Sequence, residues 1–222
     1  MNGVLFDLDG VITDTAALHF KAWSKLANDE FDVTLPDSFE DNLKGISRKD
    51  SILRILDFID NGQTYTEAQL DQLAVEKNDY YLKEINQLTE KDVLPGINDL
   101  IDHLREKKVL LSIASASKNA PAVLKSIGLF DKFDAIADPA AVKHGKPAPD
   151  IFIEAARKIN LKPEECVGLE DAAAGVQAIN SAKAISIGIG DSKVLVAADN
   201  VVAGTGDLTV DLLENTYHAF AK

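Results

Sequence analysis

The sequence has few cysteines and no long apolar run. Cys166 is its one cysteine in 222 residues, which excludes an intramolecular disulfide and a zinc site built from paired cysteines. No run of about 18 apolar residues occurs, as a membrane span would need. Two acidic residues, Asp7 and Asp9, come soon after the N-terminus, where an export signal would be basic and then apolar. We therefore expect a cytoplasmic protein that is not bound to a membrane.

Basic residues are also scarce. The chain has 23 Lys and Arg against 36 Asp and Glu, a net charge of -13. Such a chain repels polyanions, so we expect no nucleic-acid partner, and a phosphorylated substrate would need a local cationic site. Apolar residues make up 46% and charged residues 27%, which is typical of a globular protein with a sizeable core. The length fits one large domain or one domain carrying a smaller insertion.

Short apolar runs indicate strands near the N-terminus and throughout the second half of the chain. They cover residues 4–6, 109–114, 166–169 and 184–187. Helical patterns follow the second and third of these runs, at 121–127 and 172–182. Strands that alternate with helices in this way predict βαβ units, and therefore a parallel sheet.

The segment between the first two strands has a different character. Helical periodicity dominates there, at 18–27, 50–59 and 66–88, and no strong strand pattern appears. The predicted fold is α/β, a doubly wound parallel-sheet core with an inserted α-helical cap. We assign residues 1–14 and 93–222 to the core domain and residues 15–92 to the cap domain.

Acidic residues gather where the predicted strands end. Asp7 and Asp9 follow the first strand, Ser115 the second, and Glu170 with Asp171 the third. Ligands of open α/β sheets bind at these carboxyl ends. Four carboxylates would repel one another without a cation, and all-oxygen ligands suit Mg²⁺. Acidic residues after strands also form turns or cap helices, and for either pair alone that alternative stays open.

Single residues elsewhere are weaker signals until their order is considered. Ser115 alone is typical of a turn, and Lys146 alone of a solvated lysine beside a helix start. The ordered set of DLDGVITDT at 7–15, Ser115, Lys146 and Glu170-Asp171 resembles the four signature motifs of the haloacid dehalogenase superfamily of phosphotransferases. LKGISRKDS at 43–51 and ASASKN at 114–119 are similar to segments of the hexose phosphomutases in that superfamily.

This resemblance implies covalent phosphoryl transfer. Asp7 would be the nucleophile that forms an aspartyl phosphate. Asp9 would be the general acid and base, oriented by Thr15 at the hinge to the cap. Lys146 and the Ser115 hydroxyl would stabilise the transferring group. The implied Mg²⁺ ligands are Asp7, the backbone carbonyl of Asp9, Glu170 and Asp171.

A mutase must also hold the second phosphate of a bisphosphate. The resemblance implies that Arg48 binds it, since a guanidinium suits phosphate bidentately. Ser117, Lys118 and Asn119 would join Arg48 at the start of the following helix. Without the resemblance, the favoured interpretations are a solvated turn residue for Lys118 and a helix cap for Asn119.

The insertion would act as a cap that closes over the sheet and keeps water from the aspartyl phosphate. The resemblance assigns several further cap residues to sugar binding or closure: His19, Lys44, Gly45, Ile46, Ser51 and Lys77. His19 alone, on a helix with Trp23, is more often a partly buried structural histidine than a functional one.

The activity implied is interconversion of β-D-glucose 1-phosphate and D-glucose 6-phosphate. β-D-glucose 1,6-bisphosphate would be its intermediate and activator, a phosphorylated hexose its only partner, and the protein a monomer. One alternative is a phosphatase of the same architecture that acts on a small sugar or polyol phosphate. A second is a non-catalytic binding scaffold, which the occupied motif positions make the weaker hypothesis.

Overall fold

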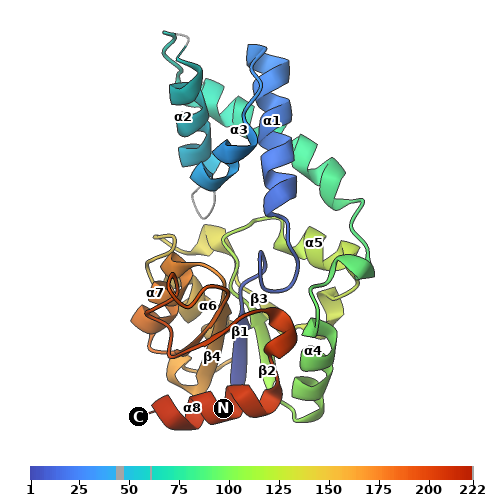
Figure 1. Ribbon diagram of the computed structural model, residues 1–222, viewed down its shortest axis with the longest axis vertical. Coiled ribbons are helices and arrows are strands. Elements are labelled where there is room, and N and C mark those ends of the chain that lie inside the picture. Colours follow the sequence, from blue (N-terminus) through green and yellow to red (C-terminus); the bar gives the residue numbers. More distant parts are fainter. Residues whose placement is uncertain (44–47, 61, 222) are drawn as a thin grey trace. The chain divides into compact units, whose positions relative to one another are not determined.

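The computed structural model describes residues 1–43, 48–60 and 62–221. It contains two compact units, shown in Figure 1. The sheet unit comprises residues 1–14 and 89–222, and the helical unit comprises residues 15–88. These units are defined by their internal packing. The domain boundaries drawn from the sequence, at 14/15 and 92/93, stay a prediction.

The sheet unit is built on one parallel sheet. Its strands are β1 (Gly3–Phe6), β2 (Leu110–Ile113), β3 (Ala135–Ile136), β4 (Cys166–Glu170), β5 (Ile185–Ile189) and β6 (Asn200–Val202). They lie in the order β3-β2-β1-β4-β5-β6, and every neighbouring pair is parallel. This is the order of a doubly wound fold, with its switch point between β1 and β4. The predicted fold class is confirmed.

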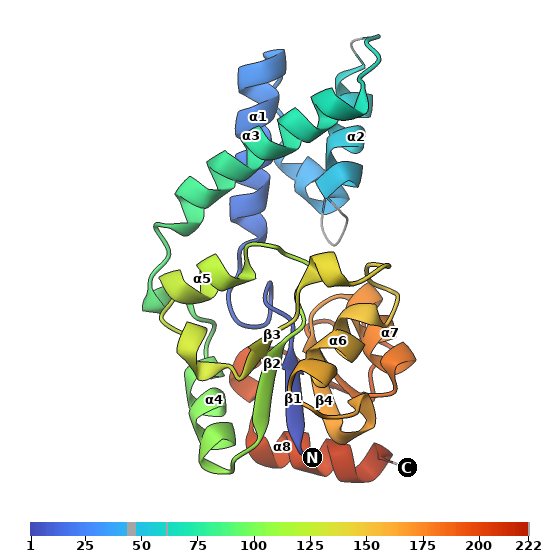
Figure 2. The ribbon, with the colours of Figure 1, turned by 180° about the vertical axis from the view of Figure 1, so that it is seen from behind.

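Helices cover both faces of this sheet. They are α4 (Ile97–Glu106), α5 (Ala120–Ser126), α6 (Asp150–Lys158), α7 (Ala173–Ala182) and α8 (Val210–Phe220). α6 packs against β1 and β2, and α7 against β4 and β5. α8 contacts β4, β5 and α4, and Figures 1 and 2 show α8 on the face away from α6. β1 is buried along its whole length, so the residues that follow it are anchored to the core of the sheet unit.

The helical unit contains α1 (Ala16–Phe31), α2 (Arg48–Ile59) and α3 (Glu67–Ile85). α3 begins with a capping box in which the Thr66 side chain accepts from the backbone of Gln69 and the Gln69 side chain accepts in return. α1 packs along α3, and α2 also packs on α3. Their apolar faces enclose a separate core that includes Trp23, Leu26 and Ile55.

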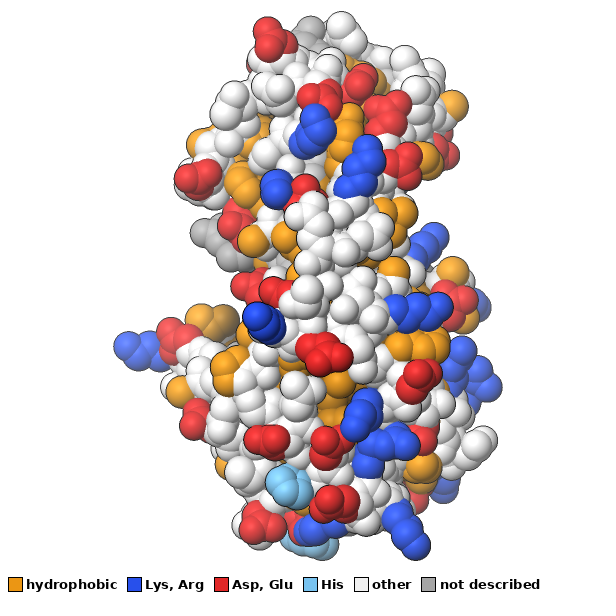
Figure 3. Space-filling view, turned by 90° about the vertical axis from the view of Figure 1, so that its right-hand side faces the viewer, with side chains coloured by type: hydrophobic (Ala, Val, Ile, Leu, Met, Phe, Trp, Pro, Cys, Tyr) orange, Lys and Arg blue, Asp and Glu red, His pale blue; other side chains and the backbone are white. Residues whose placement is uncertain are grey.

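Short 3₁₀ segments connect several of these elements: Asp37–Asn42, Glu90–Asp92, Phe130–Lys132, Pro139–Ala141, Pro163–Glu165 and Thr205–Asp207. Among the described residues, no helix is both long and apolar enough to cross a membrane. On the face drawn in Figure 3, acidic and basic side chains lie among one another.

Candidate active site

The site lies at the switch point of the sheet, where β1 and β4 end side by side. Phe6 pairs with Leu169 in the parallel register, and the Asp7 amide donates to the Leu169 carbonyl at 3.0 Å. Asp7 therefore emerges next to Glu170. The strand ends at Phe6, so Asp7 and Asp9 lie in the segment that follows β1.

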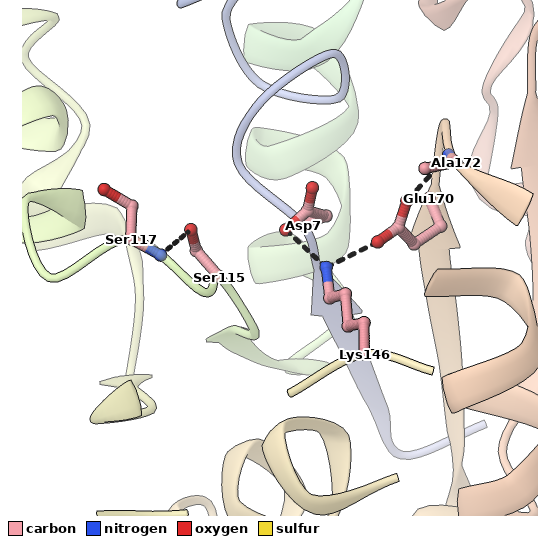
Figure 4. A network of polar contacts seen from close by, with 6 residues as sticks. All are labelled: Asp7, Ser115, Ser117, Lys146, Glu170 and Ala172. Atoms are coloured by element: carbon pink, nitrogen blue, oxygen red, sulfur yellow. Dashed lines mark hydrogen bonds and ion pairs between the residues drawn. The ribbon is translucent and has the colours of Figure 1, made fainter. Parts of the chain in front are cut away.

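Lys146 joins the ends of these two strands, as Figure 4 shows. Its Nζ lies 2.8 Å from Asp7 Oδ1 and also donates to Glu170 Oε1. The other oxygen of Glu170 accepts from the Ala172 amide at 2.8 Å. Only 12% of the Lys146 side chain is exposed, so the alternative of a solvated lysine is wrong.

Burial changes the acidity of these groups. It raises the pKa of Asp7 to about 6, although the neighbouring Lys146 charge opposes the shift. Burial and then the charge of Asp7 raise the pKa of Asp9 to about 8. Burial disfavours the charged form of Lys146, but Asp7 and Glu170 outweigh this effect and raise its pKa. The strand ends thus concentrate negative charge that one lysine only partly balances.

Two glycines allow the acidic side chains to approach the backbone. Gly10 has a φ of +74°, and a Cβ there would lie 2.0 Å from the Asp171 carboxylate. A Cβ at Gly175, in the first turn of α7, would lie 1.8 Å from Glu170 Oε1. No side chain fits at either place. Sequence reasoning missed Gly175, whose signal was a glycine inside a predicted helix.

The acidic cluster fits a divalent metal ion. Asp7, Glu170 and Asp171 each offer a carboxylate oxygen, and these atoms lie within 4.8 Å of one another. The donors are all oxygen and two of the three residues are buried, which suits Mg²⁺. The resemblance implies that Asp9 binds the metal through its backbone carbonyl. Its side-chain carboxyl would then remain available for proton transfer.

A second group of predicted residues follows β2. Ser115 is buried, and its Oγ accepts from the Ser117 amide at 3.0 Å. Ser117 Oγ in turn accepts from the Asn119 amide at 3.2 Å. Lys118 is exposed. Asn119 holds the N-cap position of α5, but its side chain makes no capping hydrogen bond, so the structure does not support the simple capping alternative.

His19 and Lys77 meet inside the helical unit. Lys77 Nζ lies 2.6 Å from His19 Nδ1, and the His19 ring stacks on Tyr81 with centroids 4.0 Å apart. Lys77 also lies over the rings of Trp23 and Tyr81 at 4.8 and 4.6 Å. Burial, together with the charges of Lys77 and Arg48, lowers the pKa of His19 to about 3. His19 is therefore neutral at physiological pH.

The remaining predicted cap residues are distributed through the same unit. Arg48 opens α2, and its Nη2 donates to Asn78 Oδ1 at 2.9 Å. Ser51 is buried on α2, and Thr15 is buried at the N-cap position of α1. Asn78 was not predicted, and nothing in the sequence distinguishes it. Three predicted residues lie outside the described part of the chain: Lys44, Gly45 and Ile46.

Comparison with known proteins identifies the family. The model of the haloacid dehalogenase-like hydrolases matches residues 1–183. The chain belongs to this family. Within the family it is 41% identical over 220 residues to the β-phosphoglucomutase of Bacillus subtilis, across 99% of this chain and 97% of that protein. The resemblance inferred from the motifs is confirmed.

Solved structures and other curated relatives are also similar to this chain. A crystal structure of β-phosphoglucomutase from Clostridium difficile superimposes with a TM-score of 0.93 at 41% identity, covering 99% of this chain and 98% of that one. Hydrolases of the family are also similar. A fructose-1-phosphate phosphatase of Escherichia coli is 29% identical over 183 residues, 81% of this chain and 92% of that protein.

Proposed function

We propose that the protein is a β-phosphoglucomutase, which interconverts β-D-glucose 1-phosphate and D-glucose 6-phosphate. The observation that carries this proposal is the 41% identity to a β-phosphoglucomutase over 99% of the chain. That match extends through the helical unit as well as the sheet unit, and the helical unit is where a hexose would be recognised. The geometry at the strand ends supplies the chemistry.

Asp7 is the nucleophile in this proposal. One carboxylate oxygen attacks phosphorus, the bond from phosphorus to the sugar oxygen breaks, and an aspartyl phosphate results. Lys146, already 2.8 Å from Asp7, stabilises negative charge on the transferring group, and the buried Ser115 hydroxyl donates to it. Mg²⁺ bound by Asp7, the Asp9 carbonyl, Glu170 and Asp171 would offset the repulsion between the carboxylate and the phosphoryl group.

Asp9 handles the proton. It donates a proton to the departing sugar oxygen, and it takes one from the attacking hydroxyl when the phosphoryl group returns to the other end of the sugar. Such transfer contributes roughly 10² to 10⁴ in rate. Thr15, the buried first residue of the helical unit, orients Asp9 in this scheme.

The second phosphate distinguishes a mutase from a hydrolase. Arg48 in the helical unit, with Ser117, Lys118 and Asn119 in the sheet unit, would hold that phosphate while the first is transferred. His19, Lys77 and Ser51 would contact the sugar or transmit closure of the cap, as would Lys44, Gly45 and Ile46. β-D-glucose 1,6-bisphosphate is then both intermediate and activator. We expect a cytoplasmic monomer, since one chain supplies every residue named.

Product analysis with the two anomers of glucose 1-phosphate tests this function. Purified protein with Mg²⁺ and a trace of the 1,6-bisphosphate should convert the β-anomer to glucose 6-phosphate and leave the α-anomer unchanged. Equal turnover of both anomers would contradict the substrate assignment. Release of phosphate from either one, with no glucose 6-phosphate, would favour the sugar phosphatase that the family's hydrolases suggest.

A further inference from the structure

Arg48 is held by an uncharged partner. Its Nη2 donates to the side-chain oxygen of Asn78 on α3 at 2.9 Å. Within the described part of the helical unit, the ion pairs join other side chains, and none includes Arg48. Asn78 thus occupies one of the five guanidinium donors and brings no negative charge to Arg48.

The surroundings of this pair are cationic. Lys77 precedes Asn78 on α3 and is buried with 1% of its surface exposed. The charges of Lys77 and Arg48 act in the same direction on the half-buried His19, disfavouring a third positive charge beside them. A carboxylate at position 78 would pair with Arg48 directly and offset its positive charge.

We infer that Asn78 is the positioning residue for Arg48, and that its neutrality lets the enzyme retain a second phosphate. This inference rests on the proposed mutase function. An arginine side chain has many rotamers, and a fixed hydrogen bond on one nitrogen orients the rest of the planar fork before phosphate arrives. Asparagine orients the guanidinium without neutralising it. Alanine removes the orientation, and aspartate keeps it but cancels the charge.

The experiment compares Asn78→Asp and Asn78→Ala with the wild-type enzyme. Asn78→Asp should raise the KM for β-D-glucose 1,6-bisphosphate by about 10- to 100-fold, the range expected for hydrogen bonds to charged groups. Asn78→Ala should raise it less, by up to about 10-fold. The rate of hydrolysis of p-nitrophenyl phosphate, which has no second phosphate, should change far less in both variants. The kcat of the mutase reaction should also change far less than the KM.

The matched control is Gln72→Glu, which adds the same charge to an exposed position of α3 and should leave the KM within about twofold. Unfolding followed by the fluorescence of Trp23, the only tryptophan, shows whether each variant keeps its helical unit folded. An unchanged KM in folded Asn78→Asp would overturn the inference. So would a decrease in KM for Asn78→Ala, which would mean that Asn78 sequesters Arg48 from phosphate.

A double-mutant cycle separates this inference from the proposed function. Adding Asn78→Ala to Arg48→Ala should cause no further loss of glucose 6-phosphate binding in calorimetry, because Asn78 acts through Arg48. If the substitution at position 78 weakens binding as much in the Arg48→Ala background as it does when Arg48 is present, the positioning role is refuted. This binding measurement does not depend on turnover, so a wild type without mutase activity would defeat the proposed function while the cycle still decides the role of Asn78.

Discussion

At the residue scale, Lys146 explains why three carboxylates can lie so close together. Asp7 and Glu170 are buried, and buried charges are unfavourable unless they are paired. Lys146 pairs with both of them. One cation does not balance Asp7, Glu170 and Asp171 together, so the cluster is suited to receive a divalent ion without losing the lysine.

Gly175 provides a test at this scale. Its replacement by alanine should displace the Glu170 carboxylate, since a Cβ would lie 1.8 Å from Oε1. We expect Gly175→Ala to weaken Mg²⁺ binding by about 10- to 100-fold, as losses of supporting contacts around metal ligands typically do. The helix itself should not be weakened, because alanine has the higher helix propensity by about 1 kcal/mol. Calorimetric Mg²⁺ titration measures the effect.

Gly204→Ala is the matched control. Nothing lies within 4 Å of a Cβ built at Gly204, which lies outside the acidic cluster, so its Mg²⁺ affinity should equal that of the wild type. Wild-type affinity in Gly175→Ala would show that Glu170 has room to move and that Gly175 does not shape the site.

Some of the site residues could be predicted from the sequence and others could not. Asp7 and Glu170 were predictable because strand ends of a parallel sheet meet at one edge, whichever residues lie between. Lys146 was assigned to the site by the resemblance, because its contact to Asp7 spans 139 residues and comes from a loop, for which residue pattern alone gives no direction. Asn78 was unpredictable for the same reason, since a neutral side chain on a helix has no distinctive spacing.

At the element scale, α1 and α3 bring a histidine beside a buried lysine. Burial and the nearby Lys77 and Arg48 charges lower the pKa of His19 to about 3, from 6.5 in an unfolded chain. The unfolded state therefore binds more protons between these two values. The resulting stability is present above pH 6.5 and is lost as the pH falls toward 3.

His19→Gln should remove this pH dependence. Between pH 6.5 and 5, the free energy of unfolding of the wild-type helical unit should fall by up to about 1.4 kcal/mol per pH unit more than that of the variant. Denaturant titration followed by Trp23 fluorescence reports this unit, because Trp23 is buried in its core. His144→Gln, at an exposed loop histidine with 72% of its side chain exposed, should retain the wild-type slope. Parallel slopes for His19→Gln and wild type would show that His19 takes up no additional proton on unfolding.

The elements differ in how well the sequence predicts them. β1 and β4 are predicted because both are continuous apolar runs ended by acidic residues. β3 has two residues and β6 three, too few to show any periodicity, and both were missed. α4 was also missed, although Ile97, Leu100, Ile101 and Leu104 follow helical spacing and are buried. Short edge strands are specified by their neighbours in the sheet, which the local sequence does not contain.

At the scale of the whole molecule, the proposed function assigns chemistry to one unit and recognition of the sugar to the other. The sheet unit contains the acidic cluster and Lys146, and the helical unit contains Arg48, His19 and Lys77. The net charge of -13 opposes phosphate binding in general, so both units need local cations. Each unit contains a lysine with little exposed surface, Lys146 in the sheet unit and Lys77 in the helical unit.

Removal of Mg²⁺ should abolish turnover and lower stability without unfolding the protein. A ligand that binds only the folded state stabilises it by about 2.7 kcal/mol at 100 times its dissociation constant. Thermal unfolding with EDTA and with saturating Mg²⁺ measures this difference. Asp171→Asn, which changes an exposed ligand of the cluster, should reduce it, whereas Asp131→Asn at another exposed position should not. A Tm that does not respond to Mg²⁺ in the wild type would argue against a metal site in the cluster.

In the proposed reaction, phosphate moves between the two ends of one sugar and is not lost to water. A ³¹P NMR time course of β-D-glucose 1-phosphate with the enzyme, Mg²⁺ and a trace of the 1,6-bisphosphate measures this most directly, since each phosphorus species gives its own signal. The glucose 1-phosphate signal should be replaced by glucose 6-phosphate, with inorganic phosphate remaining a minor product. Inorganic phosphate growing in step with the loss of glucose 1-phosphate, without glucose 6-phosphate, would contradict the claim.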